Sequence, residues 1–141
     1  MKKTLNFHIN VGRTEMNGSP VYHNLKGLFD HVGHNLIEHE WTLMDEFLQL
    51  CSTMDIGMQC NFSETFNIVS ADLITQNVPV VTCSEIPWSF DIFNANPTNS
   101  DDIARKLKWA YKFSWIDVKI NKILLRWYSA KTAKIWVDYF G

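Results

Sequence analysis

The sequence predicts an α/β fold, a single Rossmann-like domain in which helices cover both faces of a parallel sheet. Short apolar runs alternate with longer stretches of helical spacing, as they do in βαβ units. The run Val78–Cys83 is apolar nearly throughout, which is typical of a parallel strand covered on both faces. The 141 residues are the size of one domain, and 46% hydrophobic with 20% charged residues excludes wholesale disorder.

The first part of the chain predicts two strands and two helices. Leu5–Asn10 alternates apolar and polar residues, as a half-buried strand does. Ser19 is expected to cap a helix that ends at Gly33, because serine suits the first position and glycine the last. A second strand is predicted at Leu36–Ile37, and Thr42 is expected to cap the helix that follows.

The second part predicts two more strands, an edge strand and three helices. In order, we expect a strand over 55–60, a loop over 61–65, a helix to about Gln76, a strand over 78–83, an edge strand at Ile92–Phe93, a helix capped by Asn99 or Ser100, and a C-terminal helix over 117–141. Ligands of open α/β sheets bind beyond the carboxyl ends of the strands. The loops that follow the strands are therefore where a site is expected.

The charges are unevenly distributed, although the net charge is only −2. Between Lys26 and Arg105 there are twelve acids and no Lys or Arg, whereas nine of the thirteen basic residues lie between Arg105 and Lys134. One interpretation is the solvated face of a C-terminal helix pair. The other is a basic surface for an anionic partner such as nucleic acid or a membrane.

Several classes of protein are disfavoured by the sequence. No apolar run approaches the roughly 18 residues of a membrane helix, and no signal peptide follows Met1, so we expect a cytoplasmic protein without a membrane span. The three cysteines form no CxxC motif, which disfavours a disulfide framework or a cysteine zinc site. His31 and His34 straddle the expected helix end at Gly33, so no metal site and no metal cofactor is predicted.

The stretch Ser63–Asp72 lies between a predicted strand and a predicted helix. The start of a helix binds anions through free backbone amides. Glu64 and Asp72 would be about 12 Å apart along a helix axis. Carboxylates that flank one scissile bond are about 5–9.5 Å apart. The pair therefore suits the two ends of an extended ligand, unless Glu64 merely caps the helix and Asp72 is a solvated surface acid.

This stretch and its surroundings resemble the nucleotide-binding, C-terminal half of retaining glycosyltransferases with the GT-B fold, of the family 4 type. Glu64 matches the first acid of the family pattern, Phe66 its aromatic residue, Asp72 its second acid, and Val78–Val81 the strand that follows. The resemblance covers residues 35–112 well and the remainder loosely. Its segments read FSETFNIVSADLITQNVPVVTCSEIPW and NANPTNSDDIARKLKWAY.

The resemblance implies a donor-binding domain for a nucleotide sugar. It implies contacts of Glu64, the catalytic candidate, with the donor sugar, and of Asp72 with the ribose. Pyrophosphate contacts from the backbone at Thr65, Phe66 and Asn67 follow from the same pattern. Ser63 and Trp41 complete the predicted donor-binding residues, and Glu40 or Trp41, at the end of an earlier strand, is expected to border the base. No cofactor other than this substrate is implied.

The sequence departs from the family pattern at several points. Asp72 stands where glutamate is usual, and Asn67 where glycine is usual, although asparagine tolerates a positive φ better than most residues. The family's Arg and Lys, which neutralise the donor phosphates, follow the first strand of this domain. If Leu5–Asn10 is that first strand, Arg13 and Lys26 supply the two cations. The preferred alignment instead makes Leu5–Asn10 the second strand of the domain. The first strand–helix unit and its cations are then missing.

We therefore expect a truncated donor-binding domain that does not act alone. An N-terminal Rossmann-like domain on another chain would complete a retaining hexosyl transferase. A first alternative is a non-catalytic interaction module of the same fold that associates with itself or another protein. Its sign would be four uncovered tryptophans, Trp109, Trp115, Trp127 and Trp136. A second and weaker alternative is nucleic-acid binding through the basic C-terminal helices.

Overall fold

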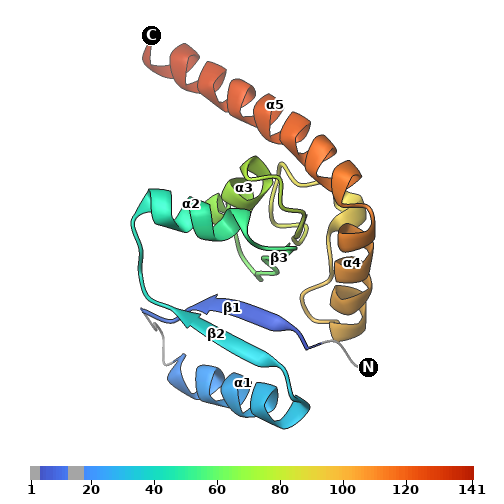
Figure 1. Ribbon diagram of the computed structural model, residues 1–141. Helices are drawn as coiled ribbons and strands as arrows, with labels where there is room; N and C mark the ends of the chain where they lie inside the picture. The colour runs from blue at the N-terminus through green and yellow to red at the C-terminus, as the bar shows by residue number, and fades with distance from the viewer. Residues whose placement is uncertain (1–3, 13–17) are drawn as a thin grey trace. The chain divides into compact units, whose positions relative to one another are not determined.

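The computed structural model describes residues 4–12 and 18–141, which divide into two compact units. The first unit is Met1–Leu43 and the second is Met44–Gly141. Each unit is described by itself below. The chain is a mixed α/β protein with small parallel sheets, which confirms the predicted fold class (Figure 1). Among the described residues the strands form two separate pairs, so a single Rossmann-like sheet stays a prediction.

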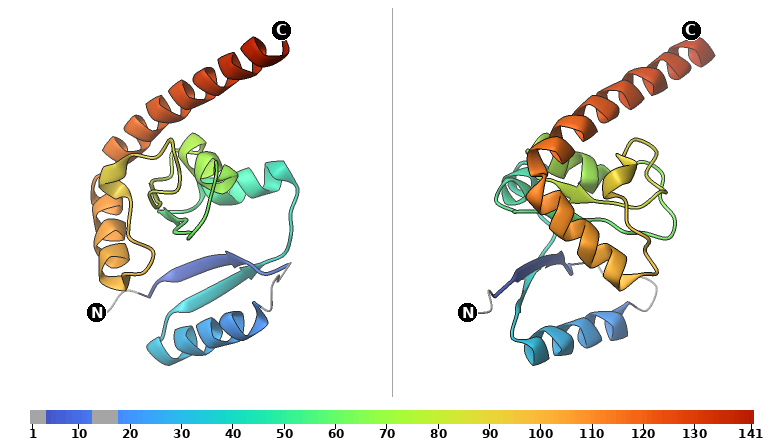
Figure 2. Two further views of the ribbon diagram at one scale, coloured as in Figure 1. Left: turned by 180° about the vertical axis from the view of Figure 1, so that it is seen from behind. Right: turned by 90° about the vertical axis from the view of Figure 1, so that its right-hand side faces the viewer.

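The first unit is one βαβ unit. Strand β1 (Asn6–Asn10) pairs in parallel with β2 (Asn35–His39), and helix α1 (Ser19–Val32) connects them. Gly33 ends α1 as predicted, because its left-handed φ of 72° lets its amide donate to the Phe29 carbonyl. The predicted cap at Ser19 is wrong: Gly18 is the N-cap and Ser19 is already helical. Figure 2 shows α1 beside this strand pair from two further directions.

The second unit begins with a second parallel strand pair. Helix α2 (Met44–Ser52) precedes β3 (Gly57–Met58), and helix α3 (Ile68–Thr75) connects β3 to its parallel partner β4 (Val80–Val81). Both strands are shorter than the predicted 55–60 and 78–83. The β3–α3–β4 connection nonetheless places the loop after β3 at the start of α3, where the sequence predicts a ligand site.

Gly57 allows α3 to lie close against β3. A Cβ atom at this position would collide with the buried Leu73 side chain of α3 and would lie 3.3 Å from Val80 Cγ2. A larger residue at position 57 would therefore require the Leu73 side chain to shift within the core.

The open side of β4 is covered by two different segments. Ala95 donates its amide to the Thr82 carbonyl over 2.8 Å, and Thr82 forms a bridge with Asn94. The predicted edge strand at Ile92–Phe93 is instead a 3₁₀ turn, Asp91–Phe93, and the bridge follows it directly. Further back along β4, the Val80 amide donates to the Asp117 carboxylate over 2.8 Å. A side chain thus takes the place of a neighbouring strand.

Two helices complete the second unit. Helix α4 (Ser100–Lys112) is capped by Asn99, as predicted, whose side chain accepts from the amides of Asp101 and Asp102. Helix α5 (Ser114–Phe140) starts three residues before the predicted 117–141 helix. Its C-terminal half extends away from the rest of the second unit (Figures 1 and 2).

The hydrophobic core described by the structure lies in the second unit. The larger of two clusters surrounds α3 and Trp88, and the smaller lies between β4 and α4. The buried members of the larger cluster are Cys51, Ala71, Leu73, Ile74, Val78, Val80, Ile86, Trp88 and Val118. Those of the smaller cluster are Val81, Phe93, Ala95 and Ala110. In the described part of the chain, no helix combines the length and the apolar character needed to cross a membrane.

Candidate functional site

The loop between β3 and α3 ends in a strained but well-supported residue, Asn67. Its φ of 56° and ψ of 86° are left-handed, and the residue is buried. Its side-chain Oδ1 accepts a hydrogen bond of 2.8 Å from the Ser70 amide, which makes it the N-cap of α3. Asparagine therefore takes up the positive φ that the resemblance assigns to glycine. The alternative in which Glu64 caps this helix is wrong.

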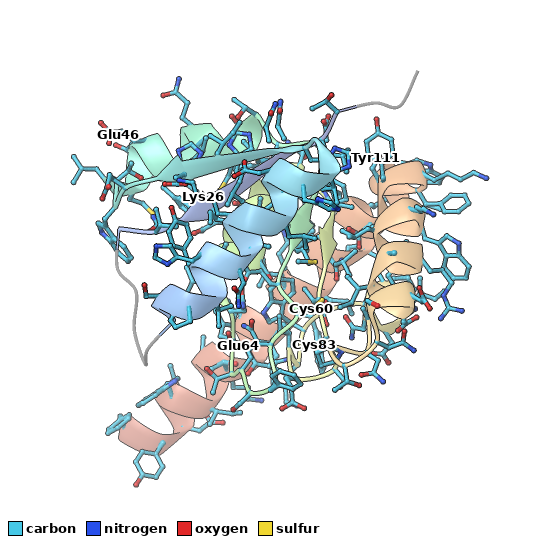
Figure 3. The ribbon with its side chains drawn as sticks, turned by 90° about the horizontal axis from the view of Figure 1, so that it is seen from below. Lys26, Glu46, Cys60, Glu64, Cys83 and Tyr111 are labelled. Carbon is cyan, nitrogen blue, oxygen red and sulfur yellow. The ribbon has the colours of Figure 1, made fainter. Side chains whose placement is uncertain are left out.

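The Glu64 carboxylate folds back onto its own loop. Oε1 accepts from the Thr65 amide, and Oε2 accepts from the side-chain amides of Asn61 and Asn67, each over 2.9 Å. The Thr65 amide is the main reason that the pKa of Glu64 is lowered, and the two asparagine side chains lower it further. Glu64 is thus an ionised group held at the amides where the resemblance implies pyrophosphate contacts. Figure 3 labels it at this end of the unit, near Cys60 and Cys83.

Phe66 contributes to the core through its ring and to the loop through its carbonyl. The carbonyl accepts a hydrogen bond of 2.6 Å from Trp88 Nε1, and the ring packs against Trp88 and Tyr128. Trp88 lies in the loop after β4, so this bond joins the two loops that follow the paired strands. The side chain of Phe66 faces the interior, which leaves its backbone as the part that can contact a ligand.

Asp72 lies on α3, on the side that faces α2. Burial raises the pKa of the Asp72 carboxyl group. The pKa of the Cys51 thiol on α2 is raised mainly by burial of that thiol and, to a smaller extent, by the charge of Asp72. Glu64 lies in the loop rather than in the helix, so the helical spacing of about 12 Å does not describe the two acids. The structure places both acids on the loop–helix segment after β3, with Asp72 on the second turn of α3.

The other predicted donor-site residues are divided between the two units. Ser63 is exposed in the same loop, and Trp41 is 80% exposed in the first unit. Lys26, also in the first unit, forms a 2.8 Å ion pair with Glu38. Arg13, the other proposed phosphate-binding cation, lies outside the described residues.

Two hollows of about 520 and 500 Å³ lie elsewhere in the second unit. They share Asn77 and Ser114, and neither is lined by a residue of the loop over 59–67. The first is bordered by Trp115, Val118, Lys119 and Lys122, and the second by Met54, Asp55, Pro79, Tyr111 and Lys112. The Glu64 carboxylate thus occupies the Thr65 amide of the loop, and both of these hollows lie away from it.

Burial makes the cysteine nearest the loop unreactive. It raises the pKa of the Cys60 thiol to about 11, with smaller contributions from Cys83 and Asp102. At neutral pH this residue is a thiol and not a nucleophile. Within the described ranges, no three His, Cys, Asp or Glu side chains are grouped so that they could hold a metal ion.

Sequence reasoning missed Asn61 and Trp88, the residues that hold the loop in shape. Asn61 and Asn67 stand three residues before and three residues after Glu64. That symmetric spacing is a signal for a carboxylate held by two side-chain amides. No comparable signal marks Trp88, because its partner Phe66 is 22 residues away.

Comparison with protein-family models, with curated proteins and with solved structures gave no match to this chain. The parallel β3–α3–β4 unit and the hydrogen bonds of the loop after β3 are therefore the observations from which a function can be inferred.

We predict that Asn67→Asp lowers the free energy of unfolding by about 1–2 kcal/mol at pH 7. The aspartate keeps the oxygen that caps α3 but turns the Nδ2 donor, 2.9 Å from Glu64 Oε2, into a second carboxylate oxygen. The loss should shrink at pH 4.5, where one of the two acids becomes protonated. Urea denaturation followed by circular dichroism at both pH values measures it.

Asn77→Asp is the matched control for this prediction. Asn77 has the other positive φ of a described non-glycine residue, 66°, but it is exposed and its Oδ1 accepts from Lys122 Nζ. A new carboxylate there faces a cation, so the stability should be unchanged or slightly higher. Equal stability of Asn67→Asp and wild type at pH 7 would contradict the proposed role of the Glu64–Asn67 bond.

Proposed function

We propose that this chain is the nucleotide-sugar donor-binding domain of a glycosyltransferase-like protein, with its site at the loop between β3 and α3. One observation supports this above the others. The loop amides at the carboxyl end of a parallel strand already hold an anion, the Glu64 carboxylate. Amides at such a position also bind the phosphates of nucleotides.

In this proposal a donor diphosphate replaces the Glu64 carboxylate at the Thr65 amide. Glu64 then turns toward the sugar hydroxyls, which an ionised carboxylate accepts as hydrogen-bond donors. Asp72, on the second turn of α3, binds the ribose hydroxyls in the same way. Ser63 and the backbone at Phe66 and Asn67 complete the contacts.

The electrostatics of the loop predict weak binding by the chain alone. Contacts between an exposed charge and a helix dipole are worth about 0.3–1 kcal/mol each. In the sequence, no Lys or Arg lies between Lys26 and Arg105 to neutralise a diphosphate. We expect a dissociation constant near 1 mM, equivalent to about −4 kcal/mol. Transfer of a hexosyl group, with retention, would need an N-terminal domain that supplies the acceptor site and cations.

Asp72→Ala should weaken nucleotide binding by about tenfold, because two ribose hydroxyls lose a charged hydrogen-bond acceptor. Titration calorimetry with UDP, GDP, ADP and their sugar conjugates measures the effect. Asp30→Ala, which removes an exposed acid from α1, is the control and should bind as wild type does. No binding of any of these nucleotides, or equal binding by Asp72→Ala and wild type, would overturn the donor-site proposal.

A second candidate is a non-catalytic interaction module that keeps the fold. The observation that favours it is the exposure of four tryptophans, namely Trp109 (45%), Trp115 (68%), Trp127 (61%) and Trp136 (59%). Aromatic side chains are enriched at protein interfaces, where they bury large areas. Self-association measured by light scattering, in a chain that binds no nucleotide, is the result that would favour this function over donor binding.

A further inference from the structure

A single stripe of side chains runs along the whole of α5 at alternating spacings of three and four residues. We call it the α5 seam; its members are Val118, Asn121, Leu125, Tyr128, Thr132, Ile135 and Tyr139. This spacing keeps side chains on one face of a helix and is that of coiled-coil core positions.

The first half of the seam is used within the second unit. Val118 and Asn121 are buried, and Leu125 and Tyr128 pack against the larger core cluster. Beyond Tyr128 the same face continues without such cover: Ile135 is 58% exposed and Tyr139 is 80% exposed. Figures 1 and 2 show this part of α5 extending past the rest of the second unit.

Two further aromatic side chains widen the exposed end of the seam. Trp136 is 59% exposed and Phe140 is 70% exposed, and their rings stack with centroids 5.2 Å apart. Lys131 and Asp138 flank the opposite border, and Lys134 points further away, as the 100° turn per residue requires. The end of α5 thus has an apolar face with a charged edge, continuous with a face that is already a packing surface.

We propose that residues 128–140 of α5 pair antiparallel with the same residues of a second copy of this chain. Matching the seam positions about a two-fold axis sets Tyr128 opposite Tyr139 and Thr132 opposite Ile135. In this register Lys131 and Asp138 of the second copy are separated by only about 3 Å along the helix axis. The two-fold symmetry forms the same pair a second time. The charged edges of the two helices are then complementary.

The charges select the antiparallel arrangement over the parallel one. In a parallel pair, the flanking position of Lys131 faces Trp136 of the other helix and not Asp138. In the antiparallel pair, Trp136 instead lies beside Ser129, a small residue that leaves space for its ring. Within the described residues, neither Lys131 nor Asp138 forms an ion pair. Lys131 Nζ lies 5.2 Å from the centroid of the Trp127 ring, a contact that it would exchange for or share with Asp138 of a second copy.

The contact is short, so association should be in the micromolar range. Thirteen helical residues span about 20 Å, and such a face is smaller than the roughly 800 Å² per partner of a standard interface. The proposal does not rest on nucleotide binding, and either can fail without the other.

Sedimentation equilibrium of the full chain from about 1 to 200 µM tests the pairing. Wild type should show a monomer–dimer equilibrium, and Ile135→Asp should be monomeric throughout. Val137→Asp is the matched control, because Val137 is 68% exposed but lies on the far side of α5 from the seam. It should leave the dissociation constant unchanged.

A charge exchange tests the orientation. Lys131→Asp and Asp138→Lys each place like charges together twice in the antiparallel pair, and each should weaken association at least tenfold. An equimolar mixture of the two variants re-forms both ion pairs in a mixed dimer and should associate as tightly as wild type. Wild type that is monomeric at all concentrations, or two variants that fail to associate when mixed, would overturn the proposal. If the first unit of the same chain covered the α5 seam instead, wild type would stay monomeric at all concentrations, and the proposal would be overturned.

Discussion

Trp88→Ala should lower the free energy of unfolding by about 4 kcal/mol, the largest effect that we expect from a single substitution. Trp88 is 2% exposed, and its indole is among the largest fully buried side chains of the chain. Its removal leaves a cavity between α3 and α5, and it leaves the Phe66 carbonyl without its 2.6 Å donor. Urea denaturation followed by circular dichroism measures the loss.

Trp88→Phe separates the hydrogen bond from the volume. Phenylalanine retains most of the ring but has no donor for the Phe66 carbonyl, so we expect a loss of about 2 kcal/mol. Trp115→Ala is the control, because Trp115 is 68% exposed and its removal should cost less than about 1 kcal/mol. If Trp88→Ala were no more harmful than Trp115→Ala, the core assignment of Trp88 would be wrong.

The second large effect is expected at Asp117, where stability should depend on pH. Its carboxylate is fully buried and accepts from the Val80 amide and the Asn121 side chain over 2.8 and 2.6 Å. Asp117→Ala leaves both donors without an acceptor, which should cost about 3 kcal/mol at pH 5. The same chemical denaturation, repeated at pH 5, 6 and 7, measures this cost.

The pH dependence follows from the difference between the folded and unfolded states. Burial raises the pKa of Asp117 to about 6, against about 3.9 in an unfolded chain. The folded state therefore binds the proton more tightly, and this group's contribution to stability is lost as the pH rises toward and through 6. The cost of Asp117→Ala should accordingly be smaller at pH 7 than at pH 5, by about 1.3 kcal/mol.

Asp101→Ala serves as the control for this experiment. Asp101 is exposed in the first turn of α4, where its charge interacts with the helix dipole, so its removal should cost less than about 1 kcal/mol at either pH. A cost of Asp117→Ala that stays constant from pH 5 to pH 7 would show that burial does not shift the titration of Asp117.

Local features of the fold were predictable because their causes lie within a few residues. The left-handed end of α1 at Gly33 and the Asn99 cap of α4 follow from the conformational range and side-chain acceptors of single residues. The loop after β3 was predicted over 61–65, whereas α3 begins only at Ile68, after its Asn67 cap. Ser19 failed as a cap because Gly18, one residue earlier, fills that position.

The position of the candidate site in the chain was predictable, but the hydrogen bonds of its Glu64 carboxylate were not. The sequence placed Glu64 in a loop before a helix, and it allowed Asn67 to adopt a positive φ. It did not predict that the Glu64 carboxylate bonds to the Thr65 amide and to two asparagine side chains, because that depends on the path of the loop. Asn67, rather than Glu64, therefore caps the helix.

The sequence by itself determined the α/β class, the approximate extent of the helices and the segment where a ligand is expected, since spacing and capping act between near neighbours. Only the tertiary structure decided that Trp88 holds Phe66, that Asp117 replaces a strand beside Val80, and that the seam of α5 continues past its own core. The first two contacts join residues 22 and 37 positions apart. The third depends on how far α5 extends past the rest of the second unit. No local pattern records them, because their partners are chosen by packing in three dimensions.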